Sequence, residues 1–182
     1  MNRRAAIKTA LTIATGFAIL PRHLRSASGP SVRLTELRIS ATEEALLAEV
    51  VETLIPATDT PGAKELKVHL FVLKMLDDCH GAVDQRAFEV GLRQLDGYAQ
   101  GLMGKHFADG DTAERENVLT SLGRKEGVSP ELWTFNRLMR SRAIEGYRES
   151  EYVMTHLLPH RMIPAPYDGY YAASNYELKE VR

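Results

Sequence analysis

The chain has 182 residues, of which 44% are hydrophobic and 26% are charged. This composition excludes a disordered protein, and the length suits one globular domain with or without a tail. The net charge of −1 hides an asymmetry, because residues 1–28 carry five basic side chains and no acidic ones. Without them, 18 basic groups stand against 24 acidic ones, so residues 29–182 sum to about −6, which disfavours nucleic acid as a partner.

The first 28 residues predict an export signal that is removed from the mature chain. The basic start contains a pair of arginines and a nearby lysine: Arg3, Arg4 and Lys8. An apolar stretch of 12 residues, Thr9 to Leu20, follows and is too short for a permanent membrane span. Ser26-Ala27-Ser28 offers small residues for signal peptidase, so we expect the mature chain to begin near Gly29.

The paired arginines resemble the twin-arginine export signal, whose pattern is S/T-R-R-x-F-L-K. Lys8 matches the pattern, while Asn2 replaces the Ser/Thr and Ala6-Ile7 replaces Phe-Leu. The resemblance implies recognition by the twin-arginine translocase and export of a folded protein to the periplasm. An ordinary secretory signal and an uncleaved anchor are the alternatives.

An extended lead-in over residues 29–39 precedes the first helix of the mature chain. Ser40 and Glu43 form a capping box that predicts a helix start at Ser40 or Thr42. Pro56 ends this helix, and a turn-rich loop follows to Gly62. Asp59 in this loop is expected to cap the helix that comes after Pro61.

Two longer segments, at about 63–79 and 83–107, have apolar residues at helical spacing. Four glycines weaken the second segment, so it either kinks or allows another helix to approach closely: Gly91, Gly97, Gly101 and Gly104. The single cysteine, Cys79, excludes an internal disulfide and is expected to be a small buried hydrophobic residue.

Two further helices carry start signals. Asp111 and Glu114 cap a short helix, and Ser129-Pro130-Glu131 begins one that runs to about Tyr147. No segment has the alternation of a strand. The sequence therefore predicts an all-α fold, a small irregular bundle of about four to six helices over residues 29–150.

Residues 151–182 form a Pro/Tyr-rich tail that differs from the rest. Six of the seven tyrosines lie within the last 36 residues. Tyrosine and methionine are enriched at protein interfaces, but composition alone leaves two options open. The tail either binds a partner or packs on its own bundle.

Signatures of catalysis are missing from the sequence. It contains no G-x-G-x-x-G, C-x-x-C-H, G-x-S-x-G or H-E-x-x-H, so we expect no dinucleotide, flavin or covalent haem in this chain. Two weak metal candidates are Asp77-Asp78-Cys79-His80 and the pair His156 and His160. The four consecutive side chains of the first candidate would point in different directions on a helix. In the second candidate, Pro159 would break the helix that a metal site at this spacing needs.

Two motifs resemble those of the gluconate 2-dehydrogenase subunit 3 family. The main one is the segment ETLIPATDTPGA, residues 52–63. It is supported by Ile144-Glu145-Gly146-Tyr147, by Ser150-Glu151 and by the Pro/Tyr-rich ending. The resemblance covers most of the mature chain.

This resemblance implies a non-catalytic accessory subunit of a flavin-dependent sugar or polyol dehydrogenase. Its partners would be a glucose-methanol-choline-type flavoprotein that holds FAD and a multihaem cytochrome c that holds haem c. We expect partner contacts from the loop and tail: Thr58, Asp59, Pro61, Gly62, Tyr147, Tyr152, Met154, Leu157, Leu158, Met162, Ile163, Tyr167, Tyr170 and Tyr171. The alternative is a stand-alone periplasmic metal-binding protein or enzyme that uses Asp77–His80 or His156/His160.

Overall fold

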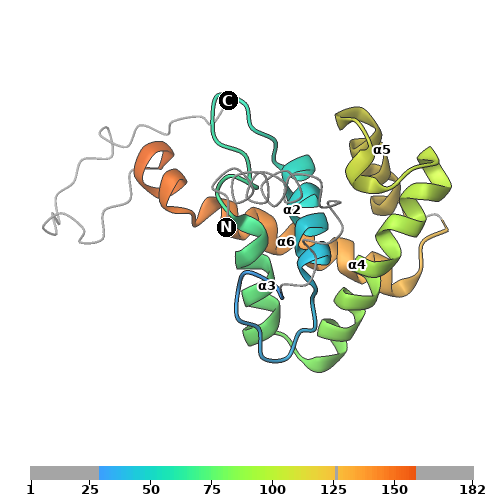
Figure 1. The fold of residues 1–182 in the computed structure, drawn as a ribbon. Coiled ribbons are helices and arrows are strands. Elements are labelled where there is room, and N and C mark those ends of the chain that lie inside the picture. The colour runs from blue at the N-terminus through green and yellow to red at the C-terminus, as the bar shows by residue number, and fades with distance from the viewer. Residues whose placement is uncertain (1–28, 126, 159–182) are drawn as a thin grey trace, which may run out of the picture.

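The computed structural model describes residues 29–125 and 127–158, and every regular element in that part of the chain is helical (Figure 1). The elements are α2 (Ala41–Leu54), α3 (Val68–Cys79), α4 (Ala82–Met103), η3 (Phe107–Asp109), α5 (Thr112–Gly123), α6 (Pro130–Arg148) and η4 (Val153–Leu157). Here η3 is a 3₁₀ turn and η4 a π-helical turn. The predicted all-α bundle is confirmed. The predicted leader at 1–28 lies outside the described residues.

Helix α6 is the central element of the bundle. It packs against α2, α3, α4 and α5, and Figure 1 shows it crossing behind α2. Its inward side chains, Phe135 among them, join one hydrophobic core with residues of the other helices such as Leu47, Leu73, Phe88 and Leu92. None of the helices in residues 29–125 and 127–158 combines the length and the hydropathy that a membrane crossing requires.

Three helix starts follow the predicted local signals. The Ser40 side chain accepts a hydrogen bond from the Glu43 backbone while Glu43 bonds back to the Ser40 backbone, which completes the capping box. Asp111 and Glu114 make the same reciprocal pair at α5. Ser129 caps α6 through the Leu132 backbone N–H, with Pro130 at the first helical position.

Two predicted boundaries are wrong. The helix expected from residue 63 begins at Val68, because residues 63–67 form turns and Lys67 adopts a left-handed conformation with φ 55°. The helix expected to reach Phe107 ends at Met103, because Gly104 at φ 74° closes it in the left-handed cap that glycine favours.

Gly91 allows α4 and α6 to approach closely, one of the two outcomes that the glycines predict. A Cβ atom at this position would lie 2.6 Å from the carbonyl oxygen of Glu131 and would also overlap Phe135. Phe135 packs on Phe88 with ring centroids 5.0 Å apart. Because Gly91 has no side chain, α4 and α6 come close enough for Phe88 and Phe135 to pack against each other.

We predict that Gly91→Ala lowers the free energy of unfolding by about 1–3 kcal/mol, because a methyl group would force α4 and α6 apart. Gly97→Ala in the same helix is the matched control, since nothing lies within 4 Å of its added Cβ. The control should raise stability by up to about 1 kcal/mol through helix propensity. Urea unfolding measures both, and equal effects would contradict this account of Gly91.

Candidate interaction site

The loop between α2 and α3 is held by one carboxylate. The Glu52 Oε1 accepts a hydrogen bond from the Ala57 backbone at 3.2 Å, and Oε2 accepts one from the Lys64 backbone at 2.8 Å. Gly62 packs against the same carboxylate, and a Cβ there would lie 2.6 Å from Glu52 Oε2. The Glu52 carboxylate thus joins the beginning of segment 52–63 to its end and closes the loop.

Tyr147 ties this loop to α6. Its hydroxyl donates to the Pro61 carbonyl at 3.1 Å and lies 3.1 Å from Thr60 Oγ1, which is left to donate in return. The two motifs that carry the family resemblance therefore meet in space. Thr58 and Asp59 lie exposed in the loop.

The predicted capping function of Asp59 is wrong. The first helix after Pro61 is α3, whose N-cap residue is Lys67, and no side chain caps it. The intervening turns between residues 63 and 67 move the helix start away from Asp59. Glu52, which precedes the loop, supplies the carboxylate that the loop backbone needs.

An open pocket, here named the α3–η4 pocket, lies between the start of α3 and the end of α6. It has a volume of about 580 Å³ and is lined by Leu66, Val68, Phe71, Gly146, Glu149, Ser150, Glu151, Tyr152, Thr155 and His156. Gly146 makes room for the Phe71 ring, since a Cβ would lie 2.9 Å from Phe71 Cγ. The rings of Tyr152 and His156 stack with centroids 4.8 Å apart.

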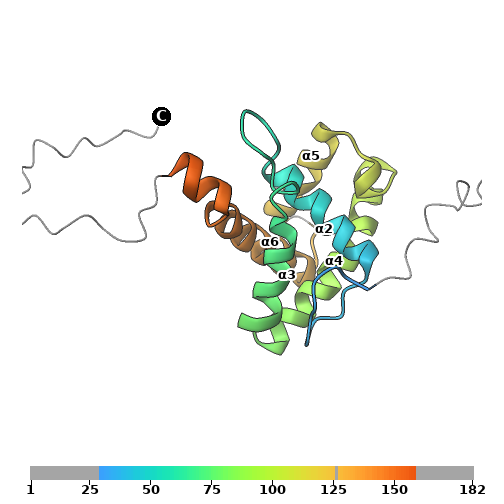
Figure 2. The same cartoon turned by 60° about the vertical axis from the view of Figure 1, so that its left-hand side comes forward.

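Four large apolar side chains, three exposed and one half-buried, lie near the C-terminal end of α6 and in or next to η4. We name Ile144, Met154, Leu157 and Leu158 the α6–η4 patch. Ile144, Leu157 and Leu158 are 48%, 45% and 50% exposed, whereas Val153 of the same turn is buried. Ile144, Met154 and Leu158 line a second hollow. Figure 2 shows η4 extending beyond the other helices.

The expected partner-binding residues divide into four groups. Tyr147 contacts the loop at Thr60 and Pro61, the loop also contains Thr58, Asp59 and Gly62, and Tyr152 lines the α3–η4 pocket. Met154, Leu157 and Leu158 belong to the patch. The remaining five, Met162, Ile163, Tyr167, Tyr170 and Tyr171, lie outside the described residues.

Sequence reasoning missed Glu52 as the anchor of the loop and Phe71, Glu149 and Glu151 as parts of the pocket. Glu52 had a signal, because it is the acid that opens the motif and precedes a loop whose backbone groups need partners. Phe71 had none, because its place in an apolar helix does not distinguish a core residue from a pocket residue.

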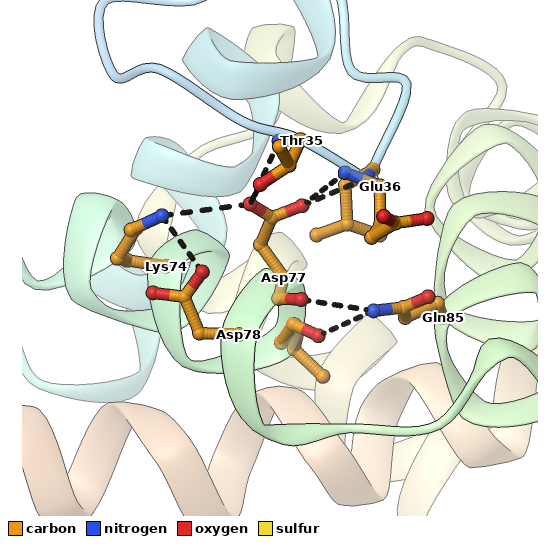
Figure 3. A network of polar contacts seen from close by, with 8 residues as sticks. Thr35, Glu36, Lys74, Asp77, Asp78 and Gln85 are labelled. Atoms are coloured by element: carbon orange, nitrogen blue, oxygen red, sulfur yellow. Dashed lines mark hydrogen bonds and ion pairs between the residues drawn. The ribbon is translucent and has the colours of Figure 1, made fainter.

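Asp77 anchors the N-terminal segment rather than a metal ion (Figure 3). Its side chain is only 4% exposed. Its carboxylate accepts hydrogen bonds from the backbone of Thr35, Glu36 and Leu37 at 2.8–2.9 Å, and from the Thr35 hydroxyl. Burial raises the pKa of Asp77, but these donors outweigh it and hold the pKa well below its usual range. The predicted extended lead-in is therefore fixed to α3.

The other residues of the Asp77–His80 group point to separate partners. Asp78 pairs with Lys74 at 2.8 Å, and His80 lies 3.3 Å from Asp84. Cys79 is exposed, so its predicted burial is wrong; the core-facing positions at this end of α3 are Leu76 and Asp77. Across residues 29–125 and 127–158, no three His, Cys, Asp or Glu side chains are grouped to hold a metal ion.

The pair His156 and His160 is described only in part, because His160 lies outside the described residues. His156 sits in the π-helical turn, where Nδ1 is 2.7 Å from Thr155 Oγ1 and 3.2 Å from the Tyr152 carbonyl oxygen. This ring nitrogen is therefore occupied by local hydrogen bonds.

The fold and this site define a small helical domain with an apolar and aromatic surface at one end. The family model for gluconate 2-dehydrogenase subunit 3 matches residues 41–166, and the chain belongs to this family. No curated protein and no solved structure matches the chain. The matched range includes the loop, the α3–η4 pocket and the α6–η4 patch.

We predict that Tyr147→Phe loosens the loop, because it removes both hydrogen bonds of the hydroxyl at a cost of about 1–2 kcal/mol. Amide hydrogen exchange should accelerate over residues 57–62 and stay unchanged in α4. Tyr98→Phe is the control, since the Tyr98 hydroxyl makes no hydrogen bond within the described residues. Equal exchange in the two variants would refute the tie.

We predict that Asp77→Asn lowers stability by about 2–3 kcal/mol above about pH 5, because hydrogen bonds to a charged acceptor are lost. The folded pKa of Asp77 is depressed, so ionised Asp77 stabilises the fold above its unfolded pKa of 3.8. This contribution shrinks progressively as the pH falls from that value toward the lower pKa of the folded state. The stability difference between wild type and variant should therefore shrink below about pH 4 in urea unfolding at stepped pH. A constant difference would contradict this.

Proposed function

We propose that this chain is the non-catalytic small subunit of a periplasmic flavin-dependent sugar or polyol dehydrogenase. In this proposal the chain carries the twin-arginine leader and takes a folded flavoprotein subunit across the membrane. It also matures and stabilises that subunit, which holds FAD. A multihaem cytochrome c would accept the electrons as a third subunit. Membership in a family of dehydrogenase subunits supports an assembly of this kind.

The α6–η4 patch is the observation that carries the proposal. Scattered apolar residues on a surface are normal, but contiguous ones beside a hollow are typical of protein interfaces. Ile144, Met154 and Leu158 line the same hollow, next to Arg148 and Glu145. Apolar anchors surrounded by charged residues are the arrangement in which a few side chains supply most of the affinity.

The loop adds a second contact region at the same end of α6. Tyr147 holds Thr60 and Pro61 one residue before Arg148, which lines the patch hollow. A partner that covers the C-terminal end of α6 would therefore reach the loop as well. A loop fixed in advance loses little conformational entropy on binding, which favours affinity.

The experiment is a co-purification from the native host. The tagged full chain is isolated from the periplasm, and its visible spectrum and associated proteins are recorded. A yellow complex with a companion of flavoprotein size would support the proposal. A colourless chain without a companion would overturn it.

We predict that Ile144→Asp combined with Leu158→Asp reduces the captured flavoprotein at least about tenfold, because each change places an unpaired charge in an apolar contact. Leu102→Asp combined with Val83→Asp on α4 is the control with the same change in charge, since both residues are exposed apolar ones, at 49% and 83%. The control should retain the companion. The ratio of flavin absorbance to tagged chain measures both. Equal losses would show that the patch is not the contact.

A further inference from the structure

The α3–η4 pocket combines an apolar floor with an acidic rim. Leu66, Val68 and Phe71 form the apolar part of its lining. Glu149 and Glu151 also line it and are exposed, and neither carboxylate makes a hydrogen bond or ion pair within the described residues. By contrast, the nearby Glu145 is paired with Arg142. Among residues 29–125 and 127–158, the pocket therefore presents two carboxylates without a partner next to apolar side chains.

This combination selects the chemistry of an occupant. A purely apolar plug would remove water from two carboxylates without replacing its hydrogen bonds, which is costly. An anion would be repelled. An arginine or lysine side chain fits both parts, because its methylene stem covers apolar surface while its cationic head meets the carboxylates. Arginine fits best, since its planar head can bond both oxygens of a carboxylate.

The aromatic wall favours the same occupant. Tyr152 and His156, whose rings stack with an interplanar angle of 16°, both line the pocket together with Glu149 and Glu151. The faces of aromatic rings attract cations, and tyrosine is among the effective ones. Charge, shape and aromatic character thus agree on a basic side chain.

We propose that the α3–η4 pocket receives an arginine or lysine side chain of the flavoprotein subunit. The inference rests on the proposed function and adds the chemistry of the contact. Glu149 lines both this pocket and the hollow of the apolar patch, so one partner surface meets both when it carries a basic residue beside an apolar area. The charge pair fixes the orientation of the partner, and the patch supplies affinity.

The test compares two double variants of the full chain in complex with its large subunit. Glu149→Lys with Glu151→Lys reverses the rim, and Glu36→Lys with Glu116→Lys makes the same change in net charge at exposed positions elsewhere. We expect the dissociation constant to rise at least about tenfold for the rim variant and less than about twofold for the control. Wild-type affinity should also fall with added salt, and the rim variant should lose that dependence.

The possible results distinguish failure of the pocket contact from failure of the proposed function. Equal affinities for the two double variants, with the flavoprotein still bound, would overturn this inference and leave the proposed function standing. Absence of any flavoprotein from the unaltered chain would overturn both. Recovery of binding by Arg161→Glu in the rim variant would identify the chain's own tail as the occupant and overturn the inference. Recovery by an Arg→Glu change in the large subunit would support it. Matching thermal midpoints confirm that the variants fold.

Discussion

Helix α6 occupies the centre of the bundle because a glycine removes the side chain at two of its tight contacts. Gly91 lets α4 approach near Glu131 and Phe135, and Gly146 lets the Phe71 ring of α3 lie against α6. Interiors pack too densely to absorb an extra methyl group without movement. The second contact also sets the position of the site, because Tyr147 follows Gly146 and points its hydroxyl at the loop. The α3–η4 pocket opens beside the same contact.

In the irregular segments, carboxylates accept the backbone hydrogen bonds that carbonyl groups accept inside the helices. Backbone outside helices has N–H groups that need acceptors, and one carboxylate can accept several of them. Asp77 serves residues 35–37 in this way, and Glu52 serves both sides of the loop. The lead-in is held further by Glu89, which accepts from the Arg38 backbone, and by Arg93, which donates to the Arg38 carbonyl. Because Asp77 belongs to α3 and Glu89 to α4, this segment is fixed only when those helices are packed together.

The sequence predicts those parts of the fold that depend on neighbouring residues. The caps at Ser40, Asp111 and Ser129 each involve atoms three residues apart, and all three are correct. The errors at helix boundaries concern single residues in left-handed conformations, Lys67 and Gly104, whereas the misassigned Asp77 depends on contacts with another segment. Asp77 resembled a metal ligand because the backbone N–H groups that donate to its carboxylate lie about 40 residues away in the sequence. Asp59 resembled a helix cap because the sequence does not show that turns over residues 63–67 delay the start of α3. The resemblance singled out the loop and Tyr147 separately, but their contact spans 86 residues and required the folded chain.

The patch and the pocket differ in the physics by which they would act, although they share the end of α6. Burying Ile144 and Leu158 would release water from apolar surface, a contribution proportional to area and little affected by dilute salt. Pairing Glu149 and Glu151 with a cation would act over a longer range, guide the approach and weaken as salt is added. A chain whose residues 29–182 carry a net charge of about −6 gains from such a division, because general repulsion of acidic proteins discourages wrong partners. A partner with a basic residue beside an apolar area satisfies both surfaces, whereas an acidic or uniformly apolar one satisfies at most one, so specificity follows from requiring the two together.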